Sequence, residues 1–158
     1  MEPVKAVAFD LDGTIYVGDT IIKGVFETLN FLKKKNIQVF YFTNNSAKTR
    51  KNIHDKLQKL GLNPAINVVY NTTYATAKYL KKNNFRKVYC CGSSGLQEEI
   101  ISAGIACVNN EESPEAVVVG LDHNFNYEKM TIALNILRKK DCGFIICNRD
   151  RTYPVENS

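Results

Sequence analysis

The chain has 158 residues, of which 44% are hydrophobic and 23% are charged, and its formal net charge is +5. These values are typical of a globular protein with one ordinary domain or two small ones, and they exclude a disordered or fibrous chain. No apolar run approaches the roughly 18 residues of a membrane span, no signal peptide is visible, and no aromatic residues interleave with the lysines, so we expect a cytoplasmic protein that binds neither membranes nor nucleic acid.

The first predicted element is a buried strand at residues 4–9, which is short, rich in β-forming residues and followed by a turn signal. Asp10 ends this strand, and Asp12 points the same way if the backbone stays extended. Gly13 then allows a sharp turn. Since open α/β sheets bind ligands at the carboxyl ends of their strands, we interpret Asp10 as a nucleophile and metal ligand and Asp12 as a general acid/base. The alternative is a strand that ends in an ordinary Asx turn.

A connection, a helix and a second strand are predicted next. The connection covers residues 15–22. The helix covers 24–36, because its apolar residues recur on one face, at Val25, Leu29 and Leu32. An apolar run at 37–42 predicts a second buried strand. This alternation favours βαβ units and a mainly parallel sheet.

Small polar residues again follow the second strand, in the run Thr43-Asn44-Asn45-Ser46. A threonine hydroxyl, together with free backbone N–H groups at a helix start, can hold a phosphate. Ser46 is a good N-cap for a helix predicted at 47–60, which Gly61 ends. Alone, the run indicates a capping loop, but an acid pair one βα unit earlier makes phosphate binding the better interpretation.

The two motifs together resemble a known family. The string Asp10–Thr14 after an apolar strand resembles the first motif of the haloacid dehalogenase-like (HAD) superfamily. With Thr43–Ser46 about thirty residues later, the chain is similar to the NagD-like branch, which includes p-nitrophenyl phosphatases. The resemblance covers essentially the whole chain. It implies an α/β fold with a partial Rossmann-like core and parallel sheet at residues 1–71, followed by an α/β cap domain at residues 72–158.

The resemblance also implies an activity, the Mg²⁺-dependent hydrolysis of small phosphorylated metabolites through an aspartyl-phosphate on Asp10. It assigns Asp12 to protonating the leaving group and activating water. Asp10 would bind Mg²⁺ together with the backbone carbonyl of Asp12. The phosphoryl group would be held by Gly13, Thr43 and Asn44.

The second half continues the α/β alternation. Helices are predicted at 74–82, 96–103 and 127–140, and strands at 87–91, 105–108, 116–119 and 143–147. The turn Gly92–Gly95 is placed like a dinucleotide-binding loop, but it lacks G-x-G-x-x-G spacing, which favours a plain tight turn. By the resemblance, cap loops face the substrate, and this implies that role for Asp122, Asn148 and Asp150. The alternative for these three residues is an ordinary strand-end loop.

The third and fourth motifs of the family, a lysine and a strand that ends in Gly-Asp, have no match within these 158 residues. Without these charges, two acids and a phosphate would face each other, so we expect turnover by this truncated chain to be strongly reduced. The alternative function is a non-catalytic remnant that at most binds phosphate or a partner. An uncovered sheet edge would favour association with a second copy of the chain. The five cysteines lack C-x-x-C spacing and are expected to be reduced thiols.

Overall fold

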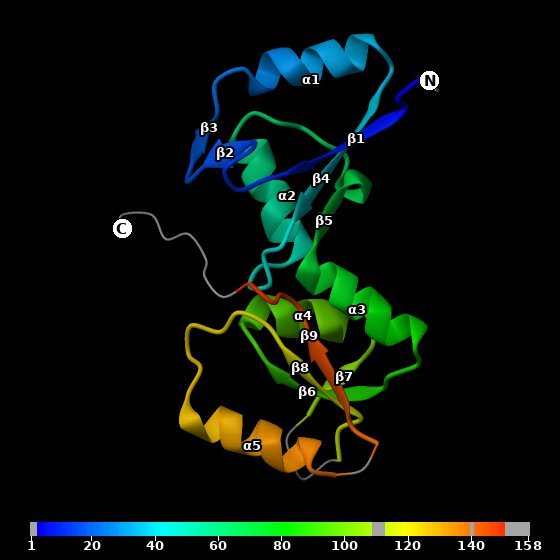
Figure 1. The fold of residues 1–158 in the computed structure, drawn as a ribbon, viewed down its shortest axis with the longest axis vertical. Helices are drawn as coiled ribbons and strands as arrows, with labels where there is room; N and C mark the ends of the chain where they lie inside the picture. Colours follow the sequence, from blue (N-terminus) through cyan, green and yellow to red (C-terminus); the bar gives the residue numbers. More distant parts are fainter. Residues whose placement is uncertain (1–2, 109–112, 140, 151–158) are drawn as a thin grey trace. The chain divides into compact units, whose positions relative to one another are not determined.

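The computed structural model of the chain describes residues 3–108, 113–139 and 141–150. Within these ranges the chain is a mixed α/β protein with five α-helices and two mainly parallel sheets, besides one small hairpin (Figure 1). Its contacts divide it into two compact units. Of the described residues, the first unit holds 3–43 and 51–70, and the second holds 44–50 and 71–150.

The first unit is built on a three-stranded sheet in the order β1-β4-β5. Strands β1 (Ala6–Asp10) and β4 (Gln38–Thr43) are parallel, and Asp10 pairs with Phe42. The carboxyl ends of these strands therefore lie at the same edge of the sheet, which places Asp10 and Thr43 on neighbouring strand ends. Strand β5 (Val69–Asn71) follows a short 3-10 helix at Ile66–Val68.

Helices α1 (Val25–Lys34) and α2 (Arg50–Lys59) supply apolar side chains to the core of this unit. The predicted stripe of α1 is confirmed, because Val25 and Leu32 are buried and Leu29 packs against the core cluster. Ile53 and Leu57 of α2 are buried in the same cluster as Val25. On the sheet, Phe9 and Tyr41 face this core and pair side by side across β1 and β4. Gly61, with φ +84°, ends α2 as predicted, in a left-handed conformation that an L side chain rarely adopts.

The connection predicted at 15–22 is in fact a β-hairpin. Strands β2 (Tyr16–Val17) and β3 (Thr20–Ile21) are antiparallel, and a two-residue turn with Gly18 at φ 56° joins them. Strands of two residues carry too little alternation to be seen in a hydrophobic pattern. The hairpin is held by the core, because Tyr16 is buried and Ile21 packs against the same cluster.

Helix α2 begins at Arg50 rather than at residue 47, and the predicted N-cap role of Ser46 is wrong. The Ser46 hydroxyl instead accepts a hydrogen bond from the Leu121 backbone N–H at 3.0 Å. The side chain of Asn45 accepts from the N–H groups of Ala47 and Lys48. These contacts hold residues 44–50 in a non-helical path, so tertiary partners override the local capping preference.

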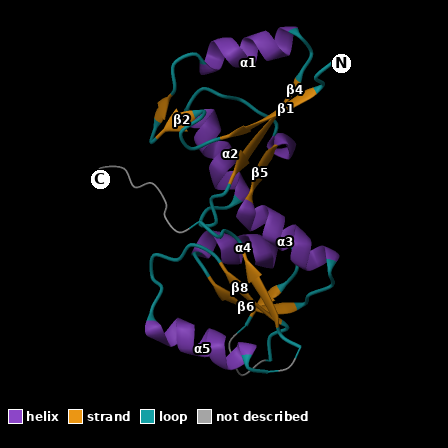
Figure 2. Cartoon of the chain, in the orientation of Figure 1, coloured by secondary structure: helices purple, strands orange, loops and turns teal. Residues whose placement is uncertain are grey.

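The second unit contains a four-stranded sheet in the order β7-β6-β8-β9, and every neighbouring pair is parallel. Figure 2 shows the strands of this sheet in orange. Its strands are β6 (Lys87–Cys91), β7 (Ala106–Cys107), β8 (Ala116–Val119) and β9 (Gly143–Ile146). Its helices are α3 (Thr72–Lys82), α4 (Ser94–Ser102) and α5 (Tyr127–Leu137). The α/β alternation predicted for this half is confirmed, with boundaries shifted by a few residues.

Helices cover both faces of this sheet. Helices α3 and α4 lie on one face and α5 lies on the other, as Figure 1 shows. The two core clusters take alternate residues of β8, because Val118 packs with Leu80 and Leu96 whereas Val117 packs with Ala133 and Ile136. A strand buried on both faces reads as a continuous apolar run, and this is the sequence pattern of β8.

The five cysteines are all free thiols, which is the state expected from their spacing. All five belong to the second unit. Within the described ranges, no helix is long and apolar enough to cross a lipid bilayer.

Candidate functional site

Both acids of the first motif are exposed at the carboxyl end of β1. The chain turns directly after Asp12, since Gly13 has φ +80° and its N–H donates to the Tyr16 carbonyl at 2.8 Å. Leu11, between the two acids, is completely buried. The side chain of Leu11 therefore anchors the loop while the two acids on either side of it stay accessible to solvent.

The structure brings Asp12 and Thr43 together, although 31 positions separate them in the sequence. The Thr43 hydroxyl donates to Asp12 Oδ2 at 3.4 Å, which is a long contact for a hydroxyl and a carboxylate. Thr43 is the last residue of β4 and is only 5% exposed. The parallel pairing of β1 and β4 explains this contact, because it brings the two strand ends to one edge.

Tyr16 lies close to both acids and was not identified from the sequence. Its ring is buried, and burial together with the charges of Asp12 and Asp10 raises the pKa of its hydroxyl. The ammonium of Lys56 lies 4.1 Å from the centre of the ring and 3.7 Å from Asp19. A buried neutral phenol with a cation above its ring is therefore the neighbour of the acid pair.

The acid pair suits magnesium in the type of its donors but does not complete a site. Mg²⁺ prefers oxygen ligands and is usually held by one or two carboxylates, several waters and the phosphates of a substrate. Asp10 and Asp12 supply two such carboxylates. Among residues 3–108, 113–139 and 141–150, no group of three acidic, histidine or cysteine side chains is placed to hold a metal ion.

In the second unit, three predicted site residues form one hydrogen-bonded cluster. The Asn44 side-chain amide donates to Asp150 at 2.5 Å. Asn148 donates to the Asn44 carbonyl at 3.3 Å, and its own oxygen accepts from the Asp150 N–H. Nothing in the spacing of residues 44, 148 and 150 predicts this cluster, which arises because the loop after β9 and the loop after β4 belong to the same unit.

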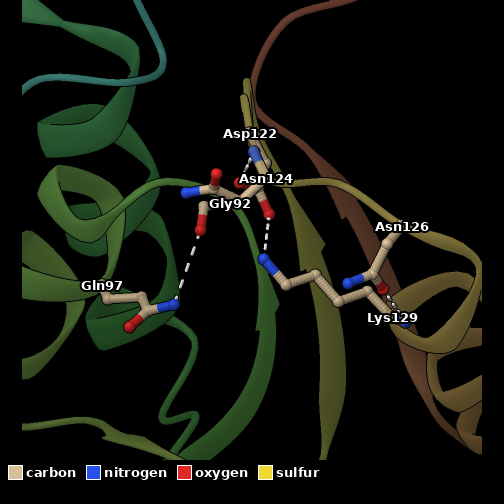
Figure 3. Close-up of polar contacts among 6 residues, drawn as sticks. All are labelled: Gly92, Gln97, Asp122, Asn124, Asn126 and Lys129. Atoms are coloured by element: carbon tan, nitrogen blue, oxygen red, sulfur yellow. Dashed lines mark hydrogen bonds and ion pairs between the residues drawn. The ribbon is translucent and has the colours of Figure 1, made fainter.

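Asp122 stands apart from this cluster. Its side chain is 4% exposed, and Oδ2 lies 2.6 Å from the ammonium of Lys129 in the first turn of α5 (Figure 3). Its Oδ1 accepts from the Asn124 N–H at 2.9 Å. Burial alone would raise the pKa of Asp122, but the hydrogen bonds from Lys129 and Asn124 outweigh it and lower the pKa. These contacts make Asp122 part of a partly buried ion pair, since the Lys129 side chain is 33% exposed, and the substrate-facing role remains a prediction.

The turn after β6 is a packing feature rather than a dinucleotide loop. Gly92 and Gly95 are both buried, and a Cβ on Gly92 would lie 2.6 Å from the end of the Leu96 side chain. Gln97 donates to the Gly92 carbonyl at 3.5 Å (Figure 3).

The pairing of Lys129 with Asp122 could have been expected from the sequence. A cation in the first turn of a helix interacts unfavourably with the helix dipole, so a nearby acidic partner is favoured there.

Residues 7–106 match the family model of the haloacid dehalogenase-like hydrolases. The chain is 36% identical over 172 aligned positions to phosphoglycolate phosphatase 2 of Arabidopsis thaliana. The aligned region covers 94% of this chain but only 57% of that relative. The chain thus spans less than two thirds of the length of a curated relative that it matches.

Solved structures show the same fold. A p-nitrophenyl phosphatase from Archaeoglobus fulgidus superposes with a TM-score of 0.89 and 32% identity, covering 98% of this chain and 59% of that one. NagD from E. coli K-12 superposes with a TM-score of 0.83 and 25% identity, covering 94% of this chain and 58% of that one. Both alignments extend over both units.

The first strand ends in two exposed acids and the parallel strand beside it ends in threonine, at the edge where open α/β sheets bind their ligands. The chain belongs to the haloacid dehalogenase-like hydrolase family, whose model matches most of its length. Within that family it falls in the NagD-like and p-nitrophenyl phosphatase branch. The family and branch expected from the two sequence motifs are therefore confirmed.

Proposed function

We propose that the protein is a phosphatase of small phosphorylated metabolites and that Asp10 is its nucleophile. The observation that carries this proposal is the meeting of Asp12 and Thr43 beside Asp10, at the carboxyl ends of β1 and β4. The net charge of +5 favours the approach of an anionic substrate. The matched phosphoglycolate and p-nitrophenyl phosphatases, by their names, act on small phosphate monoesters, which supports the same substrate class here.

In the proposed reaction, a carboxylate oxygen of Asp10 attacks the phosphorus atom, and the bond to the leaving oxygen breaks. Asp12 gives its proton to that oxygen and then accepts a proton from the water that hydrolyses the aspartyl-phosphate. The Thr43 hydroxyl, the Asn44 amide and the backbone at Gly13 are the proposed donors to the phosphoryl oxygens. Because the Gly13 N–H is bonded to Tyr16 in this structure, its contribution requires that hydrogen bond to be shared.

Magnesium is the proposed cofactor, held by Asp10 and the backbone carbonyl of Asp12, and when bound it would offset the negative charge of the acids and the phosphate. Because Mg²⁺ that is held by one or two carboxylates takes its remaining ligands from water and the substrate phosphate, we propose that it binds more tightly when phosphate is present.

The direct test is hydrolysis of p-nitrophenyl phosphate by the purified chain, with Mg²⁺ and with a chelator. We expect weak turnover, reduced by the lack of the third and fourth motifs, that depends on Mg²⁺ and is lost in Asp10→Asn, since an amide cannot form the aspartyl-phosphate. A folded sample that binds Mg²⁺ and inorganic phosphate without turnover would favour the second candidate, a non-catalytic phosphate-binding protein. That candidate is supported by the lack of a third metal-binding acid among the described residues.

A further inference from the structure

Residues 44–50, called here the post-strand segment, follow β4 directly but make their contacts within the second unit. The Thr72 hydroxyl donates to the carbonyls of Asn44 and Asn45, at 3.2 and 2.8 Å. The Ser93 hydroxyl donates to the Ala47 carbonyl at 2.5 Å. These bonds come from the first residue of α3 and the N-cap residue of α4, so the starts of two helices of the second unit hold the backbone of the segment.

The Lys48 carbonyl has two buried donors. The Thr73 hydroxyl donates to it at 2.8 Å and the Asn71 side-chain amide at 2.7 Å. Thr73 is completely buried and Asn71 is 2% exposed. Breaking either bond would leave a buried polar group without that partner, and the free-energy cost of such a loss exceeds the net gain from forming the bond. The segment is therefore restricted to one arrangement at this point.

Two further bonds fasten the segment nearer its middle and at its end. The buried Ser46 hydroxyl accepts from the Leu121 N–H, and the Arg50 N–H donates to Glu99 on α4. The donors and acceptors thus come from α3, α4 and the loop after β8, three places that are remote from the segment in sequence.

Two glycines allow the segment to approach this closely. A Cβ on Gly95, in the first turn of α4, would overlap the Ala47 carbonyl oxygen and lie 3.0 Å from the Lys48 backbone. A Cβ on Gly120 would lie 3.0 Å from the Ser46 carbonyl oxygen. At both positions the obstructing atoms of the segment are backbone atoms, which cannot move aside as the end of a flexible side chain can.

We propose that the second unit sets the path of the post-strand segment and thereby the phosphate affinity of the Thr43–Asn44 motif, with Gly95 and Thr73 as positioning residues. This inference rests on the proposed function, because it takes Thr43 and Asn44 to be phosphate donors. The effect is transmitted through the backbone, because Asn44 is covalently joined to residues 45–48 and moves when they move. A displacement of about 1 Å in a group that positions a substrate can cost up to about 100-fold in rate.

The first test is Gly95→Ala, with Gly92→Ala as the matched control in the same turn. Alanine has the higher helix propensity, so at Gly95 it would favour α4 if the segment were not in contact. At Gly92 the atoms nearest to the added methyl belong to Leu96 and Gly120 and none belongs to the post-strand segment, so this variant changes the same turn without touching the segment. We expect Gly95→Ala to weaken binding of inorganic phosphate, measured by calorimetry with Mg²⁺, by about tenfold, the loss of roughly one charge-assisted hydrogen bond. Gly92→Ala should bind within about twofold of the unsubstituted chain.

The second test replaces the hydroxyl of Thr73, in case Gly95→Ala does not fold. Thr73→Val keeps the shape but removes the donor to the Lys48 carbonyl, whereas Thr73→Ser keeps the donor. We expect Val to raise amide hydrogen exchange in residues 44–50 and to weaken phosphate binding, and Ser to restore both. For p-nitrophenyl phosphate, KM should rise more than kcat falls in the valine variant, a split that a general loss of stability does not produce.

The outcomes separate this inference from the proposed function. If the unsubstituted chain binds no phosphate with Mg²⁺, the proposed function fails, and this role fails with it. If that chain binds phosphate and both Gly95→Ala and Thr73→Val bind it equally well, only the positioning role is overturned. Faster exchange in residues 44–50 with unchanged phosphate affinity would overturn it in the same way.

Discussion

In the first unit, the carboxylates of Asp10 and Asp12 are exposed at a strand end and form no ion pair with a lysine or arginine among the described residues. In the second unit, the carboxylate of Asp122, also just beyond a parallel strand, is 4% exposed and lies 2.6 Å from Lys129. Two exposed acids of like charge do not stabilise the fold by themselves, and in the proposed function a bound cation would supply their counter-charge. Asp122 already has its counter-charge in the partly exposed Lys129, and its contacts are those of a structural element.

The largest effect expected from this comparison is the loss of activity in Asp10→Asn and Asp12→Asn. Removing a nucleophile or a proton donor should lower kcat for p-nitrophenyl phosphate by about 10³-fold or more. Asp19→Asn is the matched control, because Asp19 is a neighbouring acid of the same unit whose side chain is 93% exposed. Equal activity in Asp10→Asn and Asp19→Asn would contradict a special role for the acids of the first motif.

The next effect is on stability in the second unit. We expect Asp122→Ala to lower the melting temperature by roughly 5–10 °C, because it deprives Lys129 of its partner and leaves the Asn124 N–H without its acceptor. The control is Asp55→Ala, which removes a pair with Lys51 of the same 2.6 Å length but with side chains 38% and 75% exposed. That change should cost no more than about 2 °C. Equal shifts in the two variants, measured by calorimetry, would contradict the distinction by burial.

The ion pair also predicts a pH dependence. The pKa of Asp122 is lowered in the folded chain, so its contribution to stability is present above the unfolded pKa of about 3.9 and is lost as the pH falls through the folded value. The free energy of unfolding, measured in urea, should therefore differ most between the unsubstituted chain and Asp122→Asn at neutral pH. The difference should shrink below about pH 4. A gap that stays constant down to pH 2 would show that the charge of Asp122 does not contribute.

The smallest effects compare how helices end in the two units. Gly61 after α2 and Gly104 after α4 have nearly equal φ angles, +84° and +86°. Alanine at either position should destabilise its own unit by about 1 kcal/mol, because the left-handed conformation costs an L residue that much. Hydrogen exchange should rise in α2 for Gly61→Ala and in α4 for Gly104→Ala. A rise spread evenly over both units would show that they unfold as one.

Much of the fold was predictable because the signals were local. The apolar stripes of α1 and α2, the glycines after helices and the unbroken apolar run of β8 each report on a few consecutive residues. The hairpin at β2 and β3 was missed because each strand has two residues. The N-cap role of Ser46 was predicted wrongly because its hydroxyl accepts instead from the Leu121 N–H, 75 positions later, and the local sequence gives no sign of that donor.

The candidate site was predictable in part for the same reason. Asp10, Asp12 and Thr43 follow apolar runs, and parallel pairing brings such strand ends to one edge, so their proximity could be expected. The proximity of Tyr16 to the acids, the bond between Asn44 and Asp150, and the pairing of Asp122 with Lys129 depend on which loops meet in space.

The amino-acid order by itself determined the alternation of strands and helices, the membership of a hydrolase family and the acids of its first motif. The strands and helices could be predicted because hydrophobic period and turn chemistry act over a few residues, whereas the family followed from the resemblance of two motifs. Only the tertiary structure decided which acids stay open to solvent and which are neutralised, and which unit holds residues 44–50. Those outcomes depend on burial and on partners distant along the chain, where a few hydrogen bonds outweigh local preference.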